Sequence, residues 1–373
     1  MIFFLLSISA LYALFTLVLW LTWLRMPITK PAASQPNGPS ITVIVPVRNE
    51  AATISALLGD LARQTYPAFD VIIADDFSTD DTRLLVRQAM FGFRHPLHLL
   101  SLTDEPTASP KKRAIRQSIE QARGDLIVTT DGDCRVGPDW LATFATAYQQ
   151  TGAKLLSGPV TFTPERTLTD HLQTVEFASL IGSGATTMAM GRPTMCNGAN
   201  LCYEKRVFEE VGGFAGVDHL ASGDDELLMH KIARRYPNGV RFVKAASAIV
   251  QTGPHRNWGA FYQQRRRWAS KWRAYESYGP TALAVFIFLS NLAPVLVFLG
   301  WLLGFLNVSV LLLVVGLKAL PEFLFLRQVL VFLQKKSSVR AIPITQLVYP
   351  FYVIFFGLAA QGKGYRWKGR KLE

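Results

Sequence analysis

Hydrophobic positions along the chain form two kinds of pattern, and the first is the long apolar run. Residues Ile2–Leu24 are almost wholly apolar. About 20 apolar residues are enough for a helix to cross the hydrocarbon core of a bilayer. Neither a basic segment nor a small-residue cleavage site accompanies this run, so it predicts an uncleaved membrane anchor rather than a signal peptide.

The second pattern, from Ile41 onward, alternates short apolar runs with amphipathic segments. Ile41–Val45, Phe69–Ala74 and Leu126–Thr130 are typical of strands buried on both faces. We expect Asn49 and Ser78 to cap the helices that follow the first two strands, because such side chains satisfy free N–H groups at helix starts. The alternation predicts an α/β domain with a mainly parallel sheet flanked by helices.

Apolar runs return after residue 280, where we expect two to three spans. Thr281–Leu306 and Ile342–Ala360 are uninterrupted by charge, whereas Val308–Leu333 contains Lys318, Pro321, Glu322 and Arg327. Charges and proline inside a span predict a broken or partly interfacial segment there. The predicted parts are an N-terminal transmembrane anchor at 1–25, a linker at 26–40, a cytoplasmic α/β domain at 41–275, a C-terminal membrane region at 276–361 and a basic tail at 362–373.

Basic residues beside the apolar runs predict the orientation in the membrane. Arg25 and Lys30 follow the anchor and place the next segment in the cytoplasm by the positive-inside rule. The loop with Lys335, Lys336 and Arg340 favours the cytoplasm too, and so does the basic tail. Three full spans after residue 280 cannot satisfy both, so the sequence leaves the number of spans open.

Composition supports an integral protein of the cytoplasmic membrane. Half of the 373 residues are hydrophobic, the mean hydropathy is +0.21 and the net charge is +12. The basic residues lie mainly beside apolar segments, which fits anionic lipid headgroups better than nucleic acid. The three cysteines show no metal-ligand spacing, and their odd number argues against a disulfide framework. We therefore expect the soluble part to face the reducing cytoplasm.

Candidate chemistry is concentrated at the end of the run Leu126–Thr130. Asp131, Gly132 and Asp133 follow it directly, and glycine lets the backbone turn so that both carboxylates face one point. Ligands of open α/β sheets bind outside the carboxyl ends of strands. Two converging carboxylates suit Mg²⁺ or Mn²⁺. A solvated turn is the alternative for Asp-Gly-Asp taken alone.

Other predicted strands deliver polar residues to the same edge. Asp75 and Asp76 end the second strand, and they are turn formers if taken in isolation. The basic run 110–116 begins a helix whose N-terminus favours anions, so we place Lys111 or Lys112 near a diphosphate. A solvated helix face is the alternative for such a charge run. The coincidence of these acids with Asp131 favours a ligand-binding cleft.

Several motifs together resemble a known family. In order and spacing they resemble the inverting family 2 glycosyltransferases with a GT-A fold, and one of them fits the Gln-x-x-Arg-Trp of membrane-bound members. The motifs are Val45–Glu50, Asp75–Asp80, Asp131–Asp133, Asn197–Asn200, Ser222–Glu226 and Gln264–Trp268. The tail at Trp367–Arg370 also resembles the ending of several membrane members.

The resemblance implies transfer of a sugar, with inversion, from a UDP- or GDP-linked donor to a lipid-linked or membrane-delivered hydroxyl. It implies that Asp131 and Asp133 hold a divalent ion, that Asp76 contacts the base or ribose of the nucleotide, and that Arg267 neutralises the diphosphate. The implied substrate-binding residues are Pro46, Arg48, Glu50, Asp75, Asp76, Lys111, Lys112, Asp131, Asn197, Gln264, Arg267 and Trp268. The resemblance also implies a GT-A α/β fold with transmembrane helices at both ends.

The predicted catalytic base lies where the chain departs from the family. The family usually has Glu-Asp there, whereas this chain has Asp224 and Asp225. Direct alignment makes Asp225 the base, and alignment by the following apolar residues favours Asp224. Ser222 and Asp225 also have the spacing of a helix-capping box, which is the structural alternative.

Two other functions compete with single sugar transfer. A processive polysaccharide synthase also carries Gln-x-x-Arg-Trp, but three or four spans are few to enclose a channel. A non-catalytic nucleotide-sugar-binding subunit of a membrane complex has no need for carboxylates at each strand end. We therefore expect an enzyme that acts on a membrane acceptor.

Overall fold

The computed structural model describes residues 2–32, 38–103, 107–220, 222–269, 278–359, 365–367 and 370–372. The chain forms two compact units that interleave in sequence. We call them the sheet unit (26–164, 187–253 and 372–373) and the helical unit (1–25, 165–186 and 254–371). The helical unit thus takes in two segments of the predicted 41–275 domain. The five parts with the boundaries 1–25, 26–40, 41–275, 276–361 and 362–373 therefore stay a prediction.

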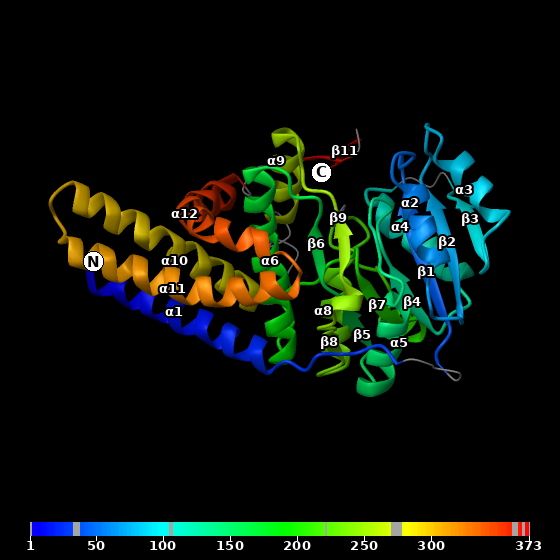
Figure 1. Cartoon of the computed structure of the whole chain (residues 1–373), viewed down its shortest axis with the longest axis horizontal. Coiled ribbons are helices and arrows are strands. Elements are labelled where there is room, and N and C mark those ends of the chain that lie inside the picture. Colours follow the sequence, from blue (N-terminus) through cyan, green and yellow to red (C-terminus); the bar gives the residue numbers. More distant parts are fainter. Residues whose placement is uncertain are drawn as a thin grey trace. The chain divides into compact units, whose positions relative to one another are not determined.

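The sheet unit is built on a seven-stranded sheet with the strand order β3-β2-β1-β4-β7-β5-β8 (Figure 1). Its strands are β1 (Ile41–Val47), β2 (Phe69–Asp75), β3 (Leu97–Ser101), β4 (Leu126–Thr129), β5 (Leu155–Ser157), β7 (Leu201–Glu204) and β8 (Val240–Phe242), with β6 (Val160–Phe162) and β9 (Val250–Thr252) in a second sheet. Its helices are α2 (Ile54–Ala62), α3 (Thr82–Met90), α4 (Pro110–Gln121), α5 (Trp140–Thr151), α7 (Lys205–Glu210), α8 (Glu226–Arg235) and the 3₁₀ helix η1 (Ala246–Ala248).

Buried apolar runs account for the centre of this sheet. β1 pairs in parallel with β2 on one side and with β4 on the other, so that Ile44 aligns with Ile72 and Thr129. Strands covered on both faces need continuous apolar runs, as these have. Only β7 is antiparallel to its neighbours among the described strands of this sheet. The predicted mainly parallel α/β sheet is confirmed.

Both predicted helix caps are wrong. Helix α2 begins after Thr53, and Asn49, whose φ is 55°, instead accepts the N–H of Thr79 at 2.8 Å. Helix α3 begins after Asp81, and the Ser78 hydroxyl accepts the N–H of Asn49 at 3.0 Å. Short polar side chains bond to backbone groups outside helices as readily as to helix ends. Here they tie together the loops that follow β1 and β2.

The helical unit consists mainly of long apolar helices. Its elements are α1 (Ile2–Arg25), most of α6 (Leu168–Ala189), α9 (Trp258–Ala269), α10 (Tyr278–Leu302), α11 (Val308–Phe332), the 3₁₀ helix η3 (Lys336–Ala341), α12 (Ile342–Ala359), the strand β10 (Tyr365–Trp367) and most of its partner β11 (Arg370–Leu372). Four helical segments are long and apolar enough to cross a membrane: Ile2–Arg25, Thr281–Leu302, Val308–Phe332 and Lys336–Ala359.

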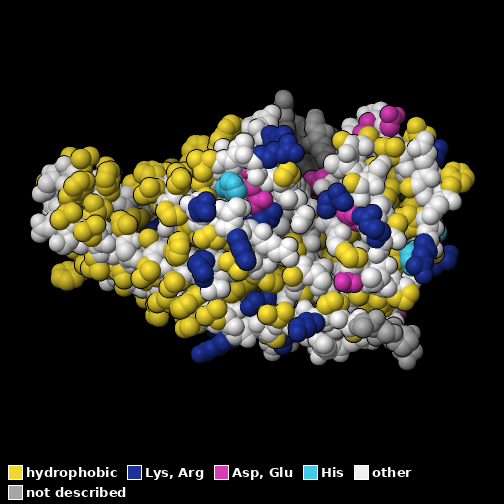
Figure 2. Space-filling view, viewed as in Figure 1, with side chains coloured by type: hydrophobic (Ala, Val, Ile, Leu, Met, Phe, Trp, Pro, Cys, Tyr) yellow, Lys and Arg dark blue, Asp and Glu magenta, His cyan; other side chains and the backbone are white. Residues whose placement is uncertain are grey.

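One of these four helices has a different direction from the others. Helices α1, α10 and α11 pack side by side and extend across the view in Figure 1, whereas α12 is seen nearly end-on. Helix α12 packs on α10, which it therefore crosses. On the face seen in Figure 2, many hydrophobic side chains lie over the bundle of α1, α10 and α11, and Lys and Arg side chains gather at its end near α6.

The predicted break in the segment 308–333 is wrong, because α11 is one continuous helix with Pro321 inside it. The charges within it are compensated. Lys318 and Glu322 form a buried ion pair, and Glu322 also accepts a hydrogen bond of 2.6 Å from the Tyr12 hydroxyl of α1. The Lys318 ammonium lies 5.0 Å from the centroid of the Tyr12 ring. Buried charges are tolerated when they are paired in this way.

The contribution of this network to the packing of α1 against α11 can be tested by substitution. Glu322→Ala leaves the Lys318 charge buried and unpaired, and we expect it to cost about 3–5 kcal/mol of stability. The double variant Lys318→Leu/Glu322→Leu should recover most of this loss. Thermal unfolding of the full chain in detergent measures both effects. Equal stability of Glu322→Ala and the parent protein would contradict the role of the pair.

Candidate active site

Acidic residues that are far apart in the sequence meet at one lysine of the sheet unit. Lys111, in the first turn of α4, places its Nζ 2.8 Å from Oδ1 of Asp131 and 3.3 Å from Oδ2 of Asp224. Asp131 follows β4, and Asp224 lies just before α8. Burial alone would lower the pKa of Lys111, but the two carboxylates raise that pKa well above its usual range. The side chain therefore stays an ammonium that compensates the acids around it.

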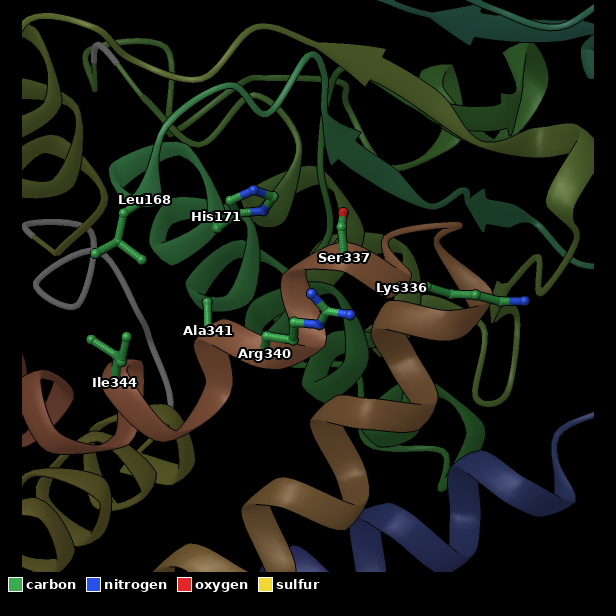
Figure 3. Close-up of a pocket in the computed structure, with 7 residues that line it drawn as sticks. All are labelled: Leu168, His171, Lys336, Ser337, Arg340, Ala341 and Ile344. Atoms are coloured by element: carbon green, nitrogen blue, oxygen red, sulfur yellow. The ribbon is translucent and has the colours of Figure 1, made fainter.

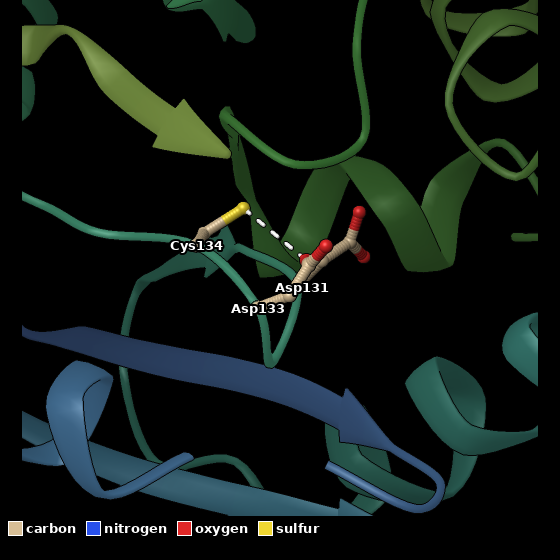
Figure 4. Close-up of side chains that lie close together, drawn as sticks. All are labelled: Asp131, Asp133 and Cys134. Atoms are coloured by element: carbon tan, nitrogen blue, oxygen red, sulfur yellow. Dashed lines mark hydrogen bonds between the residues drawn. The ribbon is translucent and has the colours of Figure 1, made fainter. Parts of the chain in front are cut away.

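Asp131 and Asp133 converge, as their sequence predicts. One ligand atom each of Asp131, Asp133 and Cys134 lie within 4.8 Å of one another (Figure 4). Thr252 donates to Oδ2 of Asp133 at 3.1 Å and so fixes that carboxylate. The carboxylates fit a hard divalent cation such as Mg²⁺ or Mn²⁺.

Cys134 is the member of this group that the sequence did not point to. Its side chain is buried, and its Sγ lies 3.8 Å from Oδ1 of Asp133. Burial, with the charges of the two aspartates, raises the pKa of the Cys134 thiol well above its usual value. A neutral thiol is a poor partner for a hard cation, so the two carboxylates are the better ligands.

Gly132 is needed for space rather than for an unusual backbone angle. Its φ does not lie in the left-handed region. A Cβ built on Gly132 would lie 2.9 Å from Cγ1 of Val47 and 3.0 Å from Cγ of Glu50. Glycine therefore allows the Asp131–Asp133 turn to approach the carboxyl end of β1, where Pro46 aligns with Ala74 of β2.

Asp225 joins the start of α8 to the segment around Asn197. Its Oδ1 accepts the N–H of Glu226 at 2.7 Å, and its Oδ2 accepts the N–H of Gly198 at 3.0 Å. Asp225 is itself the N-cap of α8, so the capping box that begins at Ser222 does not form. The Asn197 side chain accepts the N–H of Ala199 and shapes the same turn.

The two predicted lysines have different surroundings. Whereas Lys111 contacts the carboxylates, Lys112 donates to the carbonyl oxygens of Val217, Leu220 and Ser222 at 2.5, 2.8 and 3.0 Å. It thereby holds the loop that leads to Asp224. The structure brings Lys111 into the acidic cluster, and it places Lys112 under the neighbouring loop instead.

At the end of β2, Asp76 lies between two arginines. Arg48 donates to the Asp76 carbonyl at 2.7 Å, and Arg113 donates to the Asp76 carboxylate at 2.5 Å. Asp75 is fully buried and accepts from Arg83 at 2.5 Å. Its other oxygen, Oδ1, has no hydrogen-bond partner among the described residues. Arg113 was not predicted, because nothing in the sequence distinguishes it from the other basic residues of the run 110–116.

The motif Gln264–Trp268 lies on α9, in the helical unit. The side chain of Arg267 lies outside the described part of the structure. Arg265, which the sequence did not single out, is buried, pairs with Glu176 of α6 and lies 4.4 Å from the Trp268 ring centroid. Gln264 accepts a hydrogen bond from the same guanidinium.

The sequence model of glycosyl transferase family 21 matches residues 2–373. The chain belongs to this family. The predicted resemblance to glycosyltransferases is therefore confirmed, and the family that matches is number 21.

Curated relatives of this family 21 chain match part of it. The glycosyltransferase AglE of Haloferax volcanii is 31% identical over 189 residues, which are 50% of this chain and 59% of AglE. The probable glycosyltransferase YdaM of Bacillus subtilis is 24% identical over 241 residues, which are 62% of this chain and 54% of YdaM. The chain thus spans less than two thirds of the length of either relative.

A solved structure shares the fold of the chain. The mannosyltransferase PcManGT of Pyrobaculum calidifontis, in complex with GDP-Man and Mn²⁺, aligns with a TM-score of 0.53 and 18% identity. The alignment covers 92% of this chain and 99% of that one. It supports the predicted GT-A-like α/β fold.

The arginine pair at the end of β2 predicts a change in stability. Asp76→Ala leaves buried Arg113 without its carboxylate partner, and we expect a loss of about 3–5 kcal/mol. Asp218→Ala, at an exposed carboxylate, is the control and should stay within about 0.5 kcal/mol. Native-state hydrogen exchange of the full chain at β1 and β2 measures both. Equal exchange rates in the two variants would show that Arg113 does not depend on Asp76.

Proposed function

We propose that this protein transfers a sugar from a nucleotide-diphosphate sugar to a hydroxyl of a lipid-linked or otherwise membrane-delivered acceptor. The observation that carries the proposal is the contact of Lys111 with both Asp131 and Asp224 at the carboxyl edge of the sheet. This edge is where open α/β sheets bind their ligands. Membership of glycosyl transferase family 21 supports this class of reaction.

Asp131 and Asp133 would hold a divalent ion, Mg²⁺ or Mn²⁺, against the donor diphosphate. When bound, this ion supplies positive charge that offsets the charge developing on the leaving group. The presence of Mn²⁺ with GDP-Man in PcManGT supports the assignment. Lys111, which already contacts Asp131, adds a second positive charge on the same side. The donor would be a UDP- or GDP-linked sugar.

Asp225 is the proposed base that takes the proton of the acceptor hydroxyl. The Asp224 carboxylate is already engaged in an ion pair with Lys111, 3.3 Å from the Nζ of that side chain. Asp225 instead accepts two backbone N–H groups, which orient its carboxylate toward the Asn197–Gly198 turn. The acceptor oxygen then attacks the anomeric carbon as the diphosphate leaves from the opposite face. Such a direct displacement inverts the configuration.

The other predicted site residues complete the proposal. Asp75, Asp76 and Arg48 lie beside one another at the end of β2, where the nucleoside would bind. Pro46 and Glu50 are at the carboxyl end of β1, next to the turn that contains Gly132. Gln264, Arg267 and Trp268 are proposed to contact the diphosphate and the acceptor, as the resemblance implies.

The direction of α12 offers a way for the basic loop 333–341 and the basic tail 362–373 to lie on the same, cytoplasmic side of the membrane. If α1, α10 and α11 span the membrane and α12 lies along its surface, the loop 333–341 and the tail share one side. That side would also contain the sheet unit, because the basic residue Arg25 ends α1 and the sheet unit begins at residue 26. One face of α12 exposes Ile344, Leu347 and Phe351, which suits an interfacial helix. We therefore propose a protein of the cytoplasmic membrane with its sheet unit in the cytoplasm.

The orientation is tested by labelling single cysteines in a cysteine-free background. A cysteine in the tail should react in intact cells only with a membrane-permeant reagent. A cysteine in the loop 303–307 should react with an impermeant reagent as well. Labelling of the tail by the impermeant reagent would show that α12 crosses the membrane.

The metal assignment predicts loss of transfer. Asp131→Asn and Asp133→Asn remove a ligand each, and we expect at least about 100-fold slower transfer because a bound cation contributes several kcal/mol. Chelation should do the same to the parent protein, reversibly on adding Mn²⁺. Asp218→Asn is the control for a lost surface charge. Full activity in excess chelator would refute the metal while leaving the fold unaffected.

The base assignment predicts a difference between neighbouring residues. Asp225→Asn should slow transfer by about 10²–10⁴-fold, because the proton acceptor is lost while asparagine still caps α8. Asp224→Asn should be milder, and donor binding should survive in both. Transfer rates and donor affinity are compared at matched protein levels. An inactive Asp224→Asn beside a near-normal Asp225→Asn would move the base by one residue.

A further inference from the structure

A groove in the helical unit has an apolar end and a polar end. It has a volume of about 600 Å³ and lies between the start of α6 and the junction of η3 with α12. In Figure 3, Leu168, Ala341 and Ile344 lie together on one side. The polar side chains lie on the other side, and they are His171, Lys336, Ser337 and Arg340.

The polar end carries positive charge that no described carboxylate compensates. Lys336 and Arg340 are exposed, and neither forms an ion pair with another described residue. The acid nearby, Glu165, is already engaged by Lys335 at 2.8 Å and by the Ser338 hydroxyl at 3.2 Å. Ser338 also bonds to Nδ1 of His171 at 2.8 Å, which fixes the wall of the groove.

The apolar end continues along an exposed apolar face of α12. Leu168 is 54% exposed and Ile344 is 40% exposed. From Ile344 the exposed apolar face runs on along α12 through Leu347 and Val348. A ligand that matches the groove therefore has an anionic group at one end and hydrocarbon at the other.

We propose that this groove binds the headgroup of an anionic phospholipid, with the acyl chains passing over Leu168 and Ile344. The proposal rests on the membrane orientation given under the proposed function, because η3 follows the end of α11 at the level of the cytoplasmic headgroups. Lys336 and Arg340 attract the phosphate, and Ser337 supplies a hydroxyl donor. Binding would anchor η3 and α12 at the membrane surface.

The test measures lipid binding to the full chain in detergent by native mass spectrometry, without donor or transfer. The probes are phosphatidylglycerol, phosphatidylcholine and inorganic phosphate. We expect phosphatidylglycerol to be retained. The variant Lys336→Gln/Arg340→Gln should bind it about 25-fold more weakly, since each basic residue near an anionic surface contributes roughly fivefold. The control Arg87→Gln/Arg94→Gln removes the same charge from exposed positions of the sheet unit and should bind as the parent does.

A second variant keeps the proposal testable if the first does not fold. Ser337→Glu adds a negative charge to the groove and leaves both basic residues in place, so it should also weaken phosphatidylglycerol binding. Three outcomes overturn the proposal: unchanged binding in a folded groove variant, equal retention of phosphatidylcholine, or displacement of the lipid by inorganic phosphate. Because transfer plays no part in the measurement, its failure is separate from failure of the glycosyltransferase assignment.

Discussion

The contact of Lys111 with Asp131 and Asp224 is the interaction on which the candidate site depends. Parallel strands bring their carboxyl ends to one edge of the sheet, so the acids at the ends of β2 and β4 lie at that edge. The acids just before α8 reach the same site, and the negative charges of this group need compensation. One ammonium group between two of these carboxylates reduces the repulsion between their negative charges. Neighbouring basic side chains hold the loops of the site in place. Lys112, for example, donates hydrogen bonds to the loop before Asp224.

In the helical unit, buried ion pairs likewise compensate charges that lie among apolar side chains. Lys318 and Glu322 allow a charged helix to remain continuous within an apolar bundle, and Tyr12 ties that pair to α1. Arg265 pairs with Glu176, whose other oxygen accepts the Tyr352 hydroxyl of α12. Helices α6, α9 and α12 are thereby joined around one carboxylate. This junction holds the helix that carries the Gln264–Trp268 motif against α6 and α12.

The sequence predicted the parts of the fold and site that depend on local pattern. The apolar run 126–130 predicted β4, and the two aspartates that follow it predicted the converging carboxylates. Both features depend on residues that are neighbours in the sequence. The caps assigned to Asn49 and Ser78 failed because neighbouring loops compete for the same side chains. Arg113 and Arg265 were not predicted, because the sequence of a basic run does not show which of its arginines are buried. Each is identified only by its carboxylate partner, which is distant in the sequence.

The division between the units was also beyond the sequence. The segment 165–186 lies in the middle of the predicted soluble domain, yet it packs in the helical unit. Likewise, only the structure shows that α12 crosses its neighbour rather than running alongside it (Figure 1). Both features depend on contacts between distant residues, which periodicity and composition do not encode.

We propose that one sugar is transferred from a nucleotide-diphosphate donor to a membrane acceptor. The most direct measurement supplies labelled UDP- and GDP-sugars to the purified full chain with membrane lipid extract and Mn²⁺, and then separates the products by solvent extraction. We expect a discrete, lipid-extractable labelled product with one of the donors. Label in a high-molecular-weight polymer, or no label transferred from any donor, would contradict it.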